Sequence, residues 1–68
     1  MIKRLIVNGD SRTFDAVATV EQLLCALDLD AGAVVVELNR SIVRRPSLAT
    51  TPVADGDQVE IVHFVGGG

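Results

Sequence analysis

The chain is poor in aromatic residues: its 68 residues include two Phe, no Trp and no Tyr. Proteins that bind single-stranded nucleic acids stack the bases on aromatic side chains, so this composition argues against that role. The formal net charge of −3 argues against it as well, because nucleic-acid binding needs a basic surface. An acidic chain is better suited to a protein partner with a basic docking surface.

Cysteine and long apolar runs are also scarce. The single cysteine, Cys25, cannot form an internal disulfide, which is typical of a reducing compartment. No apolar run approaches the roughly 18 residues that a membrane-spanning helix needs. The residues Met1–Arg4 lead directly into an apolar strand pattern, without the features of a signal peptide. We therefore expect one small domain in the cytoplasm.

Residues that could support catalysis or hold a metal are few. The spacing of His, Cys and carboxylate residues matches no metal-binding pattern. Cys25 has no recognisable base nearby, so we expect it to be structural or incidental rather than a nucleophile. His63 has no identifiable acid or nucleophile as a partner, so packing at a strand end is the better prediction. We expect that the chain is not an enzyme.

The first part of the sequence predicts a β-hairpin. The β-branched run Ile2–Val7 indicates a strand, and Ser11–Phe14 indicates a second one. Between them, Asn8-Gly9 is a strong turn signal, because both residues tolerate positive φ. The alternation of side chains predicts that Leu5 and Val7 face the core.

A helix is expected to begin at Thr19. Thr19 and Gln22 fit a capping box, in which each side chain bonds to the backbone near the other residue. Residues Asp28–Gly32 are expected to end this helix, with Gly32 as its terminator. Cys25 falls away from the apolar side of the helix. That apolar side repeats at helical spacing and consists of Val20, Leu23, Leu24 and Leu27.

The remaining residues predict further strands. The valine-rich run Ala33–Leu38 indicates a strand buried on both faces, and Ile42-Val43 a short extended piece. Residues Ser47–Ala54 are expected to be irregular. After a turn, Val59–Val65 forms the last strand. The order of elements predicts an α+β fold, with one helix packed on one face of a mixed four- to five-stranded sheet and the other face open.

The open face of the last strand is a candidate docking surface. Glu60 is unsuited to a dry core, so we place Val59 and Ile61 inward. Val62 and Phe64 then lie on the open face, where Ile6 of the first strand joins them. Ile6, Val62 and Phe64 are therefore the predicted partner-docking residues. The alternative is that Phe64 folds over a sheet edge and packs locally.

The sequence ends in three glycines, Gly66, Gly67 and Gly68. Ordered glycine is entropically costly and brings no side chain to pack, so three in a row suggest a purpose. A tail without side chains can enter a narrow channel in a partner enzyme and present the Gly68 carboxylate to a reagent. A frayed chain end is the alternative. We therefore predict a β-sheet domain at residues 1–65 and a flexible glycine tail at residues 66–68.

These features together carry a resemblance to a known family. Val36–Asn39 followed by Ile42-Val43 and Arg45 fits its pattern, and Asp55–Gly68 is the most specific stretch. The chain resembles the ubiquitin-like β-grasp sulfur carriers, and among them the ThiS family of thiamine biosynthesis. The resemblance covers essentially the whole chain and implies a β-grasp fold.

The resemblance implies that Gly68 is the reactive residue of a carrier. An E1-like (ThiF-like) adenylyltransferase would use ATP and magnesium to adenylate the Gly68 carboxylate. Sulfur relayed from a cysteine desulfurase would replace AMP, giving a thiocarboxylate that donates sulfur to thiazole synthase (ThiG-like). The chain itself would bind no cofactor.

Three alternatives to this interpretation stay open. The small subunit of molybdopterin synthase has a similar fold and terminal glycines, but it tends to be longer. A ubiquitin-like protein modifier would share the activation chemistry and end in an isopeptide bond from Gly68 to a lysine. A plain β-grasp binding module would not need its glycines.

Overall fold

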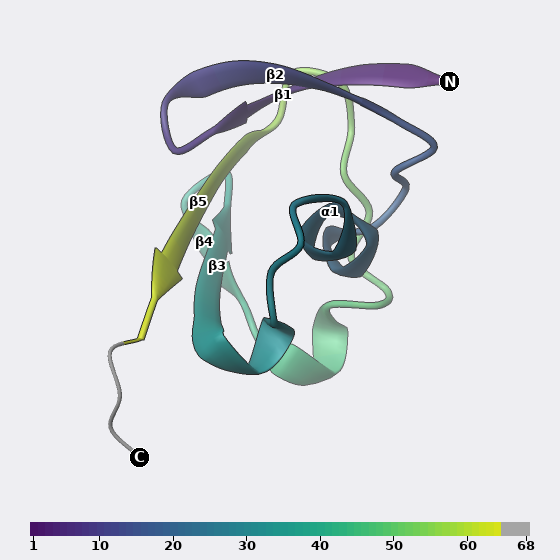
Figure 1. Ribbon diagram of the computed structural model, residues 1–68. Coiled ribbons are helices and arrows are strands. Elements are labelled where there is room, and N and C mark those ends of the chain that lie inside the picture. Colours follow the sequence, from purple (N-terminus) through teal and green to yellow (C-terminus); the bar gives the residue numbers. More distant parts are fainter. Residues whose placement is uncertain (65–68) are drawn as a thin grey trace.

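The computed structural model describes residues 1–64 and contains a single five-stranded mixed sheet (Figure 1). The strands lie in the order β2-β1-β5-β3-β4; β1 and β5 are parallel, and the other neighbours are antiparallel. The only α-helix of the described residues, α1, packs on one face of the sheet, as predicted. In chain order the elements are β1 (Ile2–Val7), β2 (Asp10–Asp15), α1 (Val20–Ala26), the 3₁₀ turn η1 (Ala31–Ala33), β3 (Val34–Leu38), β4 (Ser41–Val43), the 3₁₀ turn η2 (Arg45–Ser47) and β5 (Gln58–His63).

The predicted first hairpin is confirmed. β1 pairs with β2 along its whole length, from Ile2 opposite Asp15 to Val7 opposite Asp10, so β2 is longer than expected. Asn8 and Gly9 have φ values of 50° and 85°, which are the positive values that a two-residue type I′ turn requires. Leu5 and Val7 are buried, as the alternation predicted.

The capping box at the start of α1 is confirmed. The Thr19 hydroxyl accepts a hydrogen bond from the Gln22 N–H at 3.2 Å. The Gln22 side-chain oxygen reaches back and accepts from the Ala18 N–H at 2.6 Å. These bonds satisfy amide groups that have no partner within the helix.

The structure confirms that the helix has ended by Asp28–Gly32, but the choice of Gly32 as the terminator was wrong. Helix α1 ends at Ala26, and Asp28, with φ of 59°, takes the left-handed position that glycine often fills. The Leu29 N–H donates to the Leu24 carbonyl at 2.9 Å, which completes the end of the helix. Gly32 instead lies in η1, where Asp30 accepts its N–H at 2.9 Å. An aspartate can adopt the left-handed conformation, and this ended the helix before the glycine was reached.

The core lies between α1 and the inner face of the sheet. It includes two residues of the segment that was expected to be irregular, Leu48 and Val53, which are 5% and 2% exposed. The η2 turn and a bridge between Thr19 and Pro52 bring this segment against the helix. The buried residues are Leu5, Val7, Phe14, Val17, Val20, Leu23, Leu24, Val34, Val36, Leu48, Val53, Val59 and Ile61.

The second prediction that the structure corrects concerns β3. Val34 and Val36 are buried, but Val35 between them is only half-buried and lies on the open face of the sheet. The helix covers only one face, so a run of valines is not buried on both sides. Within residues 1–64, no helix is long and apolar enough to cross a membrane.

Candidate functional site

Strand β5 leads to the glycine-rich end of the chain and is held on both sides. On one side β3 pairs with it from Val59 to His63, and the Phe64 N–H donates to the Ala33 carbonyl at 2.9 Å. β5 is therefore anchored as far as Phe64, the last described residue. The predicted tail residues Gly66, Gly67 and Gly68 lie outside the described residues.

On the other side, β1 is too short to follow β5 to its end. The side chain of Asn8 extends the pairing: its Nδ2 donates to the Ile61 carbonyl at 3.1 Å, and its Oδ1 accepts from the Ile61 N–H at 2.7 Å. The carboxamide thus takes the place of one more residue of backbone. The Asn8-Gly9 pair was predicted only as a turn, so this second role of Asn8 was missed.

The open face beside the end of β5 is apolar. Val59 and Ile61 point into the core, as predicted, whereas Val62 and Phe64 are 60% and 56% exposed. Val35 of β3 lies directly opposite Val62, and Ile42 of the neighbouring β4 is 61% exposed. We call Val35, Ile42, Val62 and Phe64 the apolar patch.

Ile6, the third predicted docking residue, lies apart from this patch. It is half-buried and pairs with Gln58, four positions before Val62 on β5. At about 3.3 Å per residue, the separation along the strand is about 13 Å. Glu60 lies between them on the same face, so Ile6 is not a direct neighbour of Val62, and its part in docking stays a prediction.

Two carboxylates border the apolar patch. Glu37 of β3 and Glu60 of β5 are directly opposite each other, which is an unfavourable arrangement for like charges. Across residues 1–64, the single ion pair joins the Met1 amino group to Asp15 at 3.0 Å, so it neutralises neither glutamate. The open face therefore combines exposed apolar side chains with uncompensated negative charge.

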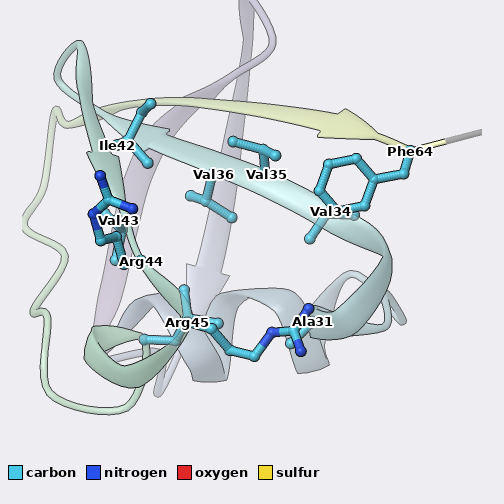
Figure 2. Close-up of a pocket in the computed structure, with 10 residues that line it drawn as sticks. Ala31, Val34, Val35, Val36, Ile42, Val43, Arg44, Arg45 and Phe64 are labelled. Atoms are coloured by element: carbon cyan, nitrogen blue, oxygen red, sulfur yellow. The ribbon is translucent and has the colours of Figure 1, made fainter. Parts of the chain in front are cut away.

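A shallow depression of about 210 Å³ lies at one end of the apolar patch (Figure 2). Val34–Val36 of β3, Phe64 and Leu48 line it, together with Arg44 and Arg45. The sequence did not predict the depression, because the depression depends on the residue at which β4 stops pairing with β3. The alternation of β3 could have placed Val35 on the open face.

The other candidate residues stand alone. Cys25 is an exposed free cysteine, away from the apolar side of α1 as predicted. His63 is exposed at the end of β5. In the part of the chain that the structure describes, no group of three or more His, Cys, Asp or Glu residues could hold a metal ion.

The mixed five-stranded sheet, the single helix and the order of the elements define a protein of the ubiquitin-like β-grasp class. A crystal structure of the thiamine biosynthesis protein ThiS from Geobacter metallireducens superposes with a TM-score of 0.82 at 43% identity, covering 96% of this chain and 99% of that one. The model of the ThiS family matches residues 5–68. The chain therefore belongs to the ThiS family.

Curated relatives are of two kinds. The sulfur carrier protein ThiS of Bacillus subtilis is 40% identical over 50 residues, covering 74% of this chain and 76% of that protein. A thiazole synthase of Paramagnetospirillum magneticum is 49% identical over 65 residues, and one of Magnetococcus marinus is 35% identical over 65 residues. Each of these matches covers 96% of this chain but 20% of the synthase, so the chain spans about a fifth of their length.

Proposed function

We propose that this protein is a sulfur carrier of thiamine biosynthesis that bears its sulfur as a thiocarboxylate on Gly68. The observation that carries the proposal is the match to the ThiS family over residues 5–68, which includes all three glycines. The similarity to the Bacillus subtilis sulfur carrier supports the same function. The chain supplies the carboxylate and a docking surface, and its partners supply the catalysis.

The proposed chemistry has two steps. An α-carboxyl group has an ordinary pKa of about 3.3–3.7, so it is ionised at neutral pH and can attack the α-phosphate of ATP. This attack releases pyrophosphate and leaves an acyl-adenylate on Gly68. In the second step, the persulfide sulfur of the donor attacks the acyl carbon, and AMP leaves with the electron pair of the broken C–O bond, giving an acyl disulfide. A second thiol of the sulfur-transfer system attacks the donor's sulfur, so the S–S bond breaks, the thiocarboxylate leaves with its electron pair, and the two thiols end as a disulfide.

The first step needs a separate activating enzyme. We assign it to an E1-like adenylyltransferase, which binds ATP and magnesium and offsets the phosphate charge with the metal and its own cationic groups. A cysteine desulfurase is the proposed source of the sulfur. This chain would meet ATP only in the active site of the activating enzyme.

The proposed acceptor of the sulfur is a thiazole synthase. Two curated thiazole synthases contain a segment similar to almost the whole of this chain. When a carrier and its acceptor occur within one polypeptide, the simplest explanation is that both take part in the same reaction. The apolar patch, which includes Phe64, is the proposed docking surface for the enzymes that act on Gly68, together with Ile6 further along the open face.

The test is intact-mass spectrometry of the protein without any added residues after Gly68. The protein is co-expressed with its adenylyltransferase and a cysteine desulfurase, and a variant that lacks Gly68 is the matched control. Replacement of one carboxylate oxygen by sulfur adds the mass difference between the two atoms. Oxidation of Met1 or Cys25 adds nearly the same mass, so fragment ions must locate the change.

We expect a sulfur-for-oxygen change on Gly68 that is absent from the truncated variant. An unmodified Gly68 in the presence of active adenylyltransferase would contradict the proposal. Adducts that join Gly68 to lysines of other proteins would instead identify a protein modifier.

A further inference from the structure

The edge of β3 has no partner strand where β4 turns away. The two strands pair from Leu38 opposite Ser41 to Val36 opposite Val43, and no further. Arg44 is extended, with φ of −75° and ψ of 154°, and the η2 turn begins at the next residue. Val34 and Val35 therefore have β5 on one side and no strand on the other. A free strand edge of this kind is a template for pairing with another extended segment.

The depression shown in Figure 2 lies at this gap in the sheet. Its volume of about 210 Å³ is several times the roughly 30 Å³ that one water occupies in the liquid, so it has room for an apolar side chain. Its lining is mostly aliphatic, and the Phe64 ring is part of it. A segment that paired with the edge of β3 could place every second side chain in the depression.

The rim of the depression is positively charged. Two of the residues that line it, Arg44 and Arg45, are arginines and none is Asp or Glu, although the whole chain has a net charge of −3. The Arg45 guanidinium donates to the Gly32 carbonyl at 3.3 Å, and in Figure 2 it reaches towards Ala31, whereas Arg44 extends towards Ile42. Within residues 1–64, no carboxylate forms an ion pair with Arg44.

We propose that this gap binds an extended segment of the thiazole synthase. The segment would pair with the edge of β3 at Val34, place an apolar side chain in the depression and set a neighbouring carboxylate against Arg44. We expect the bound segment to be acidic, because the rim is basic and no ion pair within the described residues neutralises its charge. The proposal rests on the proposed function, since that function supplies the partner.

The first test is a calorimetric titration of the full chain with thiazole synthase from the same organism at fixed salt concentration. Arg44→Glu reverses the charge at the rim, and Arg12→Glu makes the same change on β2, at the opposite edge of the sheet. Both arginines are exposed. We expect Arg44→Glu to weaken binding by about ten-fold or more and Arg12→Glu by less than about two-fold.

The second test detects pairing at the edge of β3 directly. In ¹⁵N NMR spectra, the amide signals of Val34 and Val35 should shift when the synthase is added, and hydrogen exchange at Val34 should slow. Unchanged signals there would overturn the proposal. Equal weakening by Arg44→Glu and Arg12→Glu would also overturn it, because it would indicate a general effect of net charge.

A third outcome would reveal another role for Arg44. Charged residues at strand edges prevent self-association, so Arg44→Ala, which removes the charge, could form dimers in sedimentation experiments while Arg44→Glu binds the synthase normally. That result would overturn the proposal and leave edge protection as the role of Arg44. Whether wild-type Gly68 carries sulfur separates the proposed binding site from the proposed function. If Gly68 carries sulfur and Arg44→Glu binds the synthase normally, only the gap is rejected as a binding site. If Gly68 carries no sulfur, the proposed function itself is rejected.

Discussion

The two hairpins of the sheet are built on the same plan and end differently. Each has a two-residue turn that begins with asparagine, and all four turn residues have positive φ: Asn8 and Gly9 in one, Asn39 and Arg40 in the other. β1 and β2 pair along their full length, whereas β4 pairs with β3 over only part of β3. The first hairpin thus pairs completely, and the second leaves Val34 and Val35 of β3 unpaired on the side away from β5.

Both turn asparagines also bind β5, from opposite sides. Asn8 bonds to the N–H and carbonyl of Ile61, and the Asn39 Oδ1 accepts from the Gln58 N–H at 3.0 Å. The last strand is therefore fixed by two side chains that also form the turns. The comparison teaches that hairpins with similar turns can differ in how far their strands pair: the first pairs along its full length, and the second leaves Val34 and Val35 of β3 without a partner on one side.

The largest expected difference between the hairpins is in the stability of the core. Leu5 of β1 is completely buried, so Leu5→Ala should lower the free energy of unfolding by about 3 kcal/mol. Val43 of β4 is half-buried, so Val43→Ala should cost about 1 kcal/mol. Urea unfolding followed by circular dichroism measures both values, and equal costs would contradict the expectation that the fully buried Leu5 contributes more than the half-buried Val43.

The asparagines provide a finer comparison. Asn8→Gly keeps a residue that tolerates positive φ but removes both side-chain bonds to Ile61, so it should cost about 1–2 kcal/mol. Asn39→Gly removes bonds in a more exposed place and should cost less than about 1 kcal/mol. The amide of Ile61 should exchange faster in Asn8→Gly but not in Asn39→Gly. If both variants changed it equally, the side chain of Asn8 would not be what holds this part of β5.

The sequence could predict the elements whose signals are local. The alternation Leu5, Val7 and the Asn8-Gly9 pair indicated the first hairpin, and the capping residues indicated the start of α1; the structure has both. The end of α1 was predicted only to within Asp28–Gly32, because Asp28 and Gly32 can each take the left-handed conformation that ends a helix.

The candidate site was less predictable because it depends on contacts between distant segments. Exposure of Val62 and Phe64 followed from alternation within one strand, as the structure shows. The position of Ile6 needed the register between β1 and β5, which the sequence does not reveal. The gap beside Val34 needed the point at which β4 leaves the sheet, and no local signal marks that point.

The smallest expected effect concerns the second residue of each turn, and the two turns should respond in opposite directions. Arg40 has φ of 72°, a strained value for a residue with a Cβ, so Arg40→Gly should raise the free energy of unfolding by about 0.5–1 kcal/mol. Gly9 has φ of 85°, and a Cβ built there meets nothing within 4 Å, so Gly9→Ala should cost about 1 kcal/mol through backbone strain alone. Thermal unfolding of both variants tests whether their stabilities change in opposite directions. A loss of stability in Arg40→Gly would mean that the arginine side chain stabilises the turn by more than its backbone strain costs.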